Sequence, residues 1–211
     1  MGLTQLLFAN PGLFIILASI LIYSVIFHEV AHGWVALRFG DDTAKRYGRL
    51  TLNPLSHLDP IGTLMLFFVG FGWARPVPVD YYSLKNKRFG LFSVALAGCA
   101  TNVMIAVIAL FLLHFEAVNS NPVFSIILPI VVRINIMLAS FNLIPLPPLD
   151  GSKVLMSFLP KDVQERFAGI EPYGFFILIF LLFTGLLNPW INFMYNLIFG
   201  FVGLLFGFFS G

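Results

Sequence analysis

The stretch LFIILASILIYSVIFHEVAHGWVAL, residues 13–37, is almost entirely apolar but contains a short cluster of ionisable side chains. Roughly 20 apolar residues are enough for a helix to cross the hydrocarbon core of a bilayer. His28, Glu29 and His32 lie inside this run, where ionisable groups are costly and usually functional. The stretch therefore predicts a membrane-spanning helix that carries a functional site.

The rest of the chain also has the composition of a membrane protein. Of its 211 residues, 59% are hydrophobic and only 10% are charged, whereas soluble domains carry about 25% charged residues. Further long apolar segments cover residues 91–114, 123–144 and 175–209, the last one broken at Asn188-Pro189 because the residue before a proline disfavours helix. We expect one all-α polytopic membrane domain over residues 1–211, with about five to six transmembrane helices. Residues 172–209 would form a C-terminal helix pair.

A shorter apolar stretch, residues 61–73, decides the predicted topology. If it enters the membrane and returns, every loop Lys and Arg lies on one side; if it crosses fully, these charges are split between both sides. The positive-inside rule favours the re-entrant interpretation. We therefore expect a multi-pass protein of the cell membrane with its N-terminus outside and its C-terminus and charged loops in the cytoplasm. The lipid bilayer is its expected environment, and no nucleic-acid partner is expected.

Two segments beside this stretch have extended patterns. YGRLTLNP, residues 47–54, alternates polar and apolar side chains, as half-buried strands do. In WARPVPVD, residues 73–80, Pro76 and Pro78 remove donors from one edge only, so the other edge could pair. The two segments predict a small β-hairpin region near the cytoplasmic face. Elsewhere, Arg133 and Asn135 lie near the middle of a predicted span, where we expect them to pair inside the bundle.

The cluster HEVAH, residues 28–32, has the spacing of a metal site. His28 and His32 are four residues apart, so they share one face of a helix and can hold the same ion. Glu29 stands beside the first ligand, where it can take a proton from water. A zinc ion with three protein ligands keeps one position for water and lowers its pKa to about 7. The alternative is a polar cluster that joins helices.

A third ligand is predicted in NLIPLPPLDG, residues 142–151. The prolines end the preceding span, and Asp150 follows them. If residues 61–73 are re-entrant, the first and third spans run in the same direction, and Asp150 arrives at the end where His28 lies about 15 Å before Arg38. Asp150 could instead cap the helix that begins there, and His57 is another possible ligand.

These motifs together resemble the site-2 protease family (peptidase family M50), the intramembrane zinc metalloproteases. HEVAH matches the family's HExxH motif, and NLIPLPPLDG matches its N-x-x-P…LDG motif. ALAGCATN, residues 95–102, resembles its G-P-x-x-N segment, although Cys99 stands where the family usually has proline. The resemblance covers about residues 15–155. It implies a three-helix catalytic core in a compact prokaryotic member without a PDZ or CBS domain.

The resemblance also implies a role for each site residue. The ligands of one Zn²⁺ per chain would be His28, His32 and Asp150. Glu29 would be the general base and later the proton donor. Asn142 would position the substrate or stabilise the oxyanion, and Asn102 would contact the substrate backbone. Hydrogen bonding between helices is the alternative role for both asparagines.

The implied function is hydrolysis of a peptide bond within or near the transmembrane segment of a membrane-protein substrate, that is, regulated intramembrane proteolysis. One alternative is a catalytically idle regulator of the same fold that binds transmembrane helices, but such a protein has no need for Glu29. Another alternative is a metal transporter. Transporters usually contain internal repeats, and none is evident in this sequence.

Overall fold

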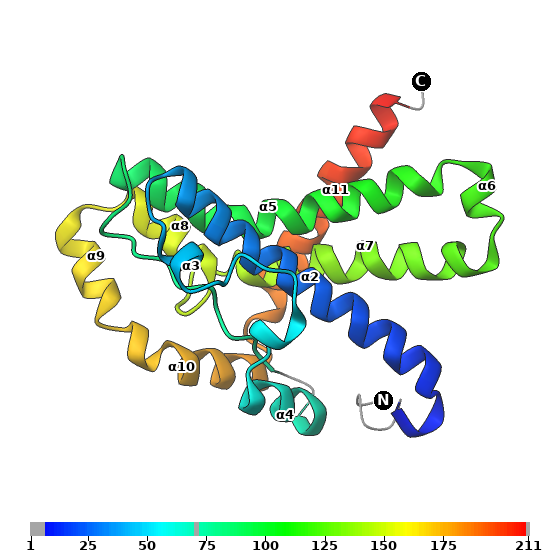
Figure 1. Cartoon of the computed structure of the whole chain (residues 1–211), viewed down its shortest axis with the longest axis horizontal. Helices are drawn as coiled ribbons and strands as arrows, with labels where there is room; N and C mark the ends of the chain where they lie inside the picture. Colours follow the sequence, from blue (N-terminus) through cyan, green and yellow to red (C-terminus); the bar gives the residue numbers. More distant parts are fainter. Residues whose placement is uncertain (1–6, 70–71, 210–211) are drawn as a thin grey trace.

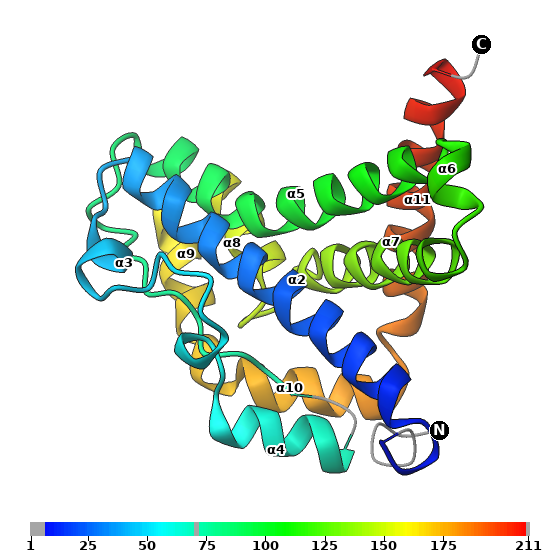
Figure 2. The same cartoon turned by 45° about the vertical axis from the view of Figure 1, so that its right-hand side comes forward.

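The computed structural model describes residues 7–69 and 72–209, and over these ranges the chain is helical and contains no strand. Among the described residues, four helices are long and apolar enough to cross a membrane, or five if one bent helix pair is counted as a span. The four are α2 (Pro11–Arg38), α5 (Lys87–Leu113), α7 (Pro122–Asn142) and α11 (Asn188–Phe209) (Figures 1 and 2). The expectation of an all-α polytopic membrane protein is confirmed.

Helix α5 packs against both α2 and α7, which also contact each other. Small residues of α5, among them Ala106 and Ala109, meet Ile136 and Ala139 of α7 in a buried cluster that also includes Val202 of α11. Small side chains allow helix backbones to approach closely, which is how helices associate where lipid offers no hydrophobic driving force. The three-helix core is therefore held by close packing, with α11 against α7.

The chain between α2 and α5 leaves the bundle and returns to the same place. It contains α3 (Thr43–Arg46), the 3₁₀ helix η1 (Pro54–Ser56) and α4 (Pro60–Val69). With ten residues, α4 is about 15 Å long, half of the roughly 30 Å hydrocarbon core. Leu58 and Ala74, on either side of α4, form an isolated antiparallel bridge. A short helix with paired ends fits the re-entrant interpretation and cannot cross the membrane.

The predicted β-hairpin region is wrong for the described residues: apart from that bridge, neither extended segment forms a strand. Side chains take the hydrogen bonds that a ladder would have used. Arg49 Nη2 donates to the carbonyl of Arg75 over 2.8 Å, and His57 Nε2 lies 2.8 Å from the carbonyl of Thr51. The backbone N–H of Arg75 donates to the carbonyl of His57. The two segments are thus joined by the Arg49 side chain and through His57, and not by a strand ladder.

After α7, the chain forms α8 (Asp150–Phe158), α9 (Lys161–Ala168) and α10 (Glu171–Phe183) before α11. The predicted break in the C-terminal apolar segment is confirmed, since α11 begins at Asn188 after a turn with Gly185 at φ 73°. The first half of the expected pair is short: α10 has 13 residues. Gly174 of α10 packs so closely on Pro147 that a Cβ would collide with its carbonyl. Helix α10 therefore covers the proline-rich loop that precedes Asp150.

The two ends of the helix bundle are formed by different elements. In both views α3, α8, α9 and the start of α5 lie at one end, while the start of α2, the end of α11 and α6 (Glu116–Asn119) lie toward the other. The C-terminal end of α11 lies away from the basic loops, and α10, with 13 residues, counts toward a span only together with α9.

Arg133 departs from expectation. Its side chain is exposed on α7 and has no ion pair or hydrogen bond with any described residue.

Candidate metal centre

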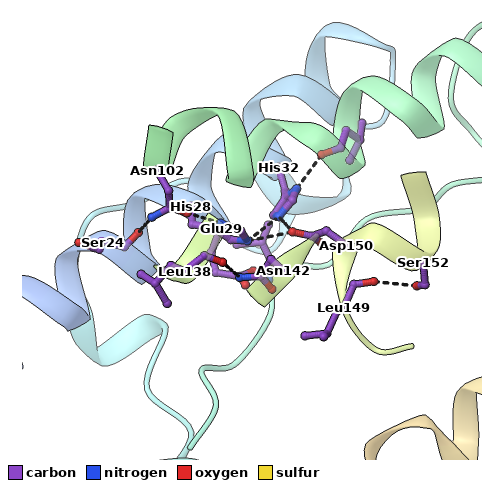
Figure 3. A network of polar contacts seen from close by, with 12 residues as sticks. Ser24, His28, Glu29, His32, Asn102, Leu138, Asn142, Leu149, Asp150 and Ser152 are labelled. Atoms are coloured by element: carbon purple, nitrogen blue, oxygen red, sulfur yellow. Dashed lines mark hydrogen bonds and ion pairs between the residues drawn. The ribbon is translucent and has the colours of Figure 1, made fainter. Parts of the chain in front are cut away.

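Three side chains from two helices converge at one point. His28 and His32 come from α2, and Asp150 is the first residue of α8. The Oδ2 atom of Asp150 lies 3.0 Å from His28 Nε2 and 3.1 Å from His32 Nε2, and the two Nε2 atoms are 3.1 Å apart. Figure 3 shows the three side chains pointing toward one another. The structure thus brings together the three residues predicted as metal ligands.

The position of Asp150 depends on the close packing of α8 against the end of α7. The N-cap of α8 is Leu149, whose extended backbone turns the chain into the helix, so Asp150 lies inside the first turn and is not itself the cap. Gly151 faces the carbonyls of Leu143 and Ile144 at the end of α7, and a Cβ would lie only 2.5 Å from the Ile144 oxygen. A glycine is therefore required directly after the carboxylate, as the LDG sequence supplies.

The space between the three ligands fits a metal ion. Two ligands about 2.0 Å from a tetrahedral ion lie about 3.3 Å apart, close to the separations seen here. The buried Oδ2 of Asp150 makes no hydrogen bond, so it is free to act as a ligand. Opposite these atoms lies Gly98 of α5, where a Cβ would stand 2.5 Å from the Nε2 atoms of both histidines. Two imidazoles and one carboxylate are a donor set typical of a zinc site with one open position.

Hydrogen bonds on the far side of each imidazole fix which nitrogen faces this space. His32 Nδ1 lies 2.7 Å from the carbonyl of Val94. A carbonyl can only accept, so Nδ1 carries a hydrogen and Nε2 is the nitrogen that faces the ligand space. His28 Nδ1 lies 2.6 Å from Asn102 Oδ1. Partners of this kind commonly orient histidine ligands and set their tautomer.

Glu29 is held by a separate contact. Its side chain is half-buried, and Oε2 accepts a hydrogen bond of 2.9 Å from the backbone N–H of Val77. Val77 lies in the segment that follows α4. This bond fixes the position of the carboxylate on the residue that follows His28, and it uses only one of the two carboxylate oxygens.

The two asparagines occupy different environments. Asn102 is 0% exposed and its amide bonds His28 and neighbouring helices, so it lies behind the metal centre and matches the interhelical alternative. Asn142 is half-buried at the end of α7, and its Nδ2 donates to the carbonyl of Leu138 over 3.0 Å. The second hydrogen of that amide is not used by this bond.

His57 is not part of the cluster. It is 1% exposed and its Nε2 bonds the carbonyl of Thr51, so it holds the loop before α4. Sequence reasoning did not identify Gly98 as a residue that shapes the site. A signal was available, because Gly98 lies four residues before Asn102 and so shares its face of α5.

A charged side chain lies one helical turn beyond Asp150. Lys153 Nζ stands 4.9 Å from the centroid of the Tyr81 ring. Burial would lower the pKa of Lys153, but Tyr81 and then Asp150 outweigh it and raise the pKa above its usual value. Lys153 is therefore an ammonium ion that adds positive charge beside the metal centre.

An apolar helix bundle that encloses these ligands, with a carboxylate beside them, defines the class of membrane-embedded metallopeptidases. The model of peptidase family M50 matches residues 116–184, a range that contains Asp150 and the loop before it. YwhC of Bacillus subtilis (strain 168), named as a candidate zinc metalloprotease, is 43% identical over 173 residues, which are 79% of each chain. The chain belongs to peptidase family M50.

Other relatives agree with this assignment. Rip2 of Mycolicibacterium smegmatis, also named as a candidate zinc metalloprotease, is 32% identical over 85% of this chain and 71% of its own length. A zinc metalloprotease of Methanocaldococcus jannaschii is 27% identical over 72% of this chain but only 37% of its own length. No solved structure matches the chain.

Proposed function

We propose that the chain is a zinc-dependent intramembrane endopeptidase that cleaves other membrane proteins within or near a transmembrane segment. The observation that carries the proposal is the convergence of the ligand atoms of His28, His32 and Asp150 within 4.8 Å of one another, inside a bundle of membrane-spanning helices. Glu29 next to the first ligand makes this arrangement suited to hydrolysis as well as to metal binding.

The residues of the chain have distinct tasks in this reaction. One zinc ion, when bound, supplies Lewis acidity that activates water and polarises the scissile carbonyl. Glu29 accepts the proton of the attacking water and later delivers it to the nitrogen of the leaving amine. The free hydrogen of the Asn142 amide can donate to the oxyanion that develops. The bond from Val77 holds the Glu29 carboxylate in place while these transfers occur.

Two segments with extended sequence patterns, residues 47–54 and 73–80, are candidates for pairing with an unwound substrate, and they differ in their backbone hydrogen bonds. In the segment after α4, the N–H groups of Arg75 and Val77 already donate within the chain. In residues 50–52, none of the three N–H groups donates to a described residue. These three residues also line a cavity of about 350 Å³ together with apolar side chains of α2, including Phe27 and Trp34. We therefore assign substrate pairing by strand addition to residues 50–52.

The orientation in the membrane follows from charge. The basic residues of α3, of α9 and of the start of α5 lie at one end of the bundle, and the positive-inside rule assigns that end to the cytoplasm. The N-terminus would then be outside. The metal centre lies toward the cytoplasmic half of α2, since His32 is six residues, about 9 Å, from the end of that helix at Arg38.

The test uses purified protein in proteoliposomes together with a panel of single-span membrane proteins that are tagged at both ends. Wild type is expected to cleave at least one of them, and Glu29→Gln is expected to bind zinc without cleaving. Glu116→Gln, on the exposed α6, is the matched control and should cleave normally. If wild type binds zinc and a substrate helix but cleaves nothing in the panel, the idle-regulator alternative replaces the protease.

A further inference from the structure

A buried chain of hydrogen bonds leads from His28 away from the metal centre and across three helices. His28 Nδ1 lies 2.6 Å from Asn102 Oδ1 of α5. Asn102 Nδ2 donates to Asn135 Oδ1 of α7 over 2.8 Å, and Asn135 Nδ2 donates to Ser24 Oγ of α2 over 2.9 Å. Ser24 is 4% exposed and both asparagines are 0% exposed, so water does not compete for these bonds. Figure 3 shows Ser24 and Asn102 next to His28.

Two backbone carbonyls determine the direction of this chain. Asn135 Nδ2 also lies 2.9 Å from the carbonyl of Val131, one turn earlier on α7. Asn102 Nδ2 also lies 3.4 Å from the carbonyl of Ser24. A carbonyl oxygen only accepts, so each amide nitrogen must face its carbonyl. The amide oxygens then face the other way, and Asn102 Oδ1 is the atom that meets His28.

This direction decides the tautomer of His28. An amide oxygen requires a donor, so His28 Nδ1 carries a hydrogen and Nε2 is the nitrogen that faces the metal centre. If the Asn102 amide were turned round, its N–H would face Nδ1. The imidazole hydrogen would then move to Nε2 and point at Asp150, where it would compete with a metal ion.

We propose that Ser24, Asn135 and Asn102 form a positioning relay that holds His28 in its Nδ1–H tautomer and thereby sets the metal affinity. The proposal rests on the proposed function insofar as it takes His28 to be a metal ligand. None of the three relay residues is among the ligands, and they act only through His28. A purely structural role, in which the amides join three helices, would affect stability but not the tautomer.

Variants of Asn135 separate these two roles. Asn135→Leu removes the acceptor that orients Asn102. Asn135→Asp, whose fully buried carboxyl would be protonated, keeps an oxygen for Asn102 Nδ2 and a hydroxyl donor for the carbonyl of Val131, so it should preserve the direction of the relay. The control is Ser140→Ala, since Ser140 is equally buried on α7 but bonds only the carbonyl of Ile136 in its own helix.

The first readout is the ¹⁵N spectrum of histidine in metal-free protein, which is tractable because the chain has only four histidines. The second is zinc affinity, measured by competition with a chelating dye. Wild type, Asn135→Asp and Ser140→Ala are expected to show the Nδ1–H form of His28. Asn135→Leu is expected to show a mixture of tautomers and to bind zinc about tenfold more weakly, as is usual when an outer partner of a ligand is lost.

A rescue variant shows whether a loss of zinc affinity in Asn135→Leu comes from the relay or from poorer folding. In Asn102→Asp/Asn135→Leu, both carboxylate oxygens of residue 102 accept, so no relay is needed to orient them. The Nδ1–H form and zinc affinity are expected to return. Unchanged tautomer and affinity in Asn135→Leu, or no recovery in the double variant, would overturn the relay. Absence of zinc binding in wild type would instead contradict the proposed function, while the metal-free spectra would still test the relay.

Discussion

Gly98 of α5 faces the imidazole of His28 so closely that a single methyl group at position 98 would stand 2.5 Å from its Nε2 atom. The volume of the metal centre is therefore set by a missing side chain on one helix as much as by the ligands on the others. Gly98→Ala is expected to abolish stoichiometric zinc binding, because its methyl group would occupy the space between the ligands. Metal content per purified chain is the measurement. Gly200→Ala, on α11 with open space around it, should retain one zinc.

Loss of the carboxylate ligand is expected to release the metal. Asp150→Ala leaves two imidazoles, which are too few for a stable three-ligand site, so zinc per chain should fall toward zero after dialysis. Asp162→Ala on the exposed face of α9 is the control. Retention of a full zinc equivalent by Asp150→Ala would mean that another residue provides the third ligand.

Removal of the metal should lower the stability of the wild-type protein. A ligand that binds only the folded state stabilises it by about 4 kcal/mol when present at a thousand times its Kd. A chelator is therefore expected to lower the Tm of wild type and to leave the Tm of Asp150→Ala unchanged. An equal shift in both proteins would show that the chelator acts elsewhere than at this centre.

The role of Glu29 as general base can be tested separately from metal binding. Glu29→Gln retains the shape of the side chain but cannot accept a proton, so cleavage should fall by about 10² to 10⁴, the usual contribution of a general base. Zinc content should be unchanged. A Glu29→Gln protein that cleaves a membrane substrate at the wild-type rate would exclude the proposed mechanism.

The proposed pairing of substrate with residues 50–52 can be tested by removing one backbone N–H group. Leu52→Pro removes an N–H that has no partner within the described chain, whereas Leu52→Ala keeps it. One hydrogen bond contributes about 0.5–1.5 kcal/mol, so kcat/KM of the proline variant should lie about twofold to tenfold below that of the alanine variant. Equal values for the two variants would place substrate pairing at another edge.

The convergence of His28, His32 and Asp150 could be predicted from sequence because it depends on local geometry. Two histidines four residues apart share a helix face whatever surrounds them, and the proline-rich loop can only deliver Asp150 at the end of its span. The break before α11 was predictable for the same reason, since Pro189 acts on the residue before it.

The parts that were not predicted depend on side chains from distant segments. The expected β-hairpin region does not form because Arg49 and His57 take hydrogen bonds that a strand ladder would have used. The contact between Asn102 and Asn135 depends on the relative register of α5 and α7, which no local pattern specifies.

The hydrogen bond between Val77 and Glu29 links the proposed general base to a segment whose position would depend on the surrounding lipid. The segment that contains Val77 follows α4, and if α4 enters the membrane and returns, its depth depends on the thickness of the surrounding lipid. A bilayer of shorter or longer acyl chains would displace this segment and pull on the carboxylate that transfers the proton. The turnover rate should therefore respond to acyl-chain length while zinc affinity, which is set by other helices, does not. The membrane would then act as a regulator of the enzyme as well as its location.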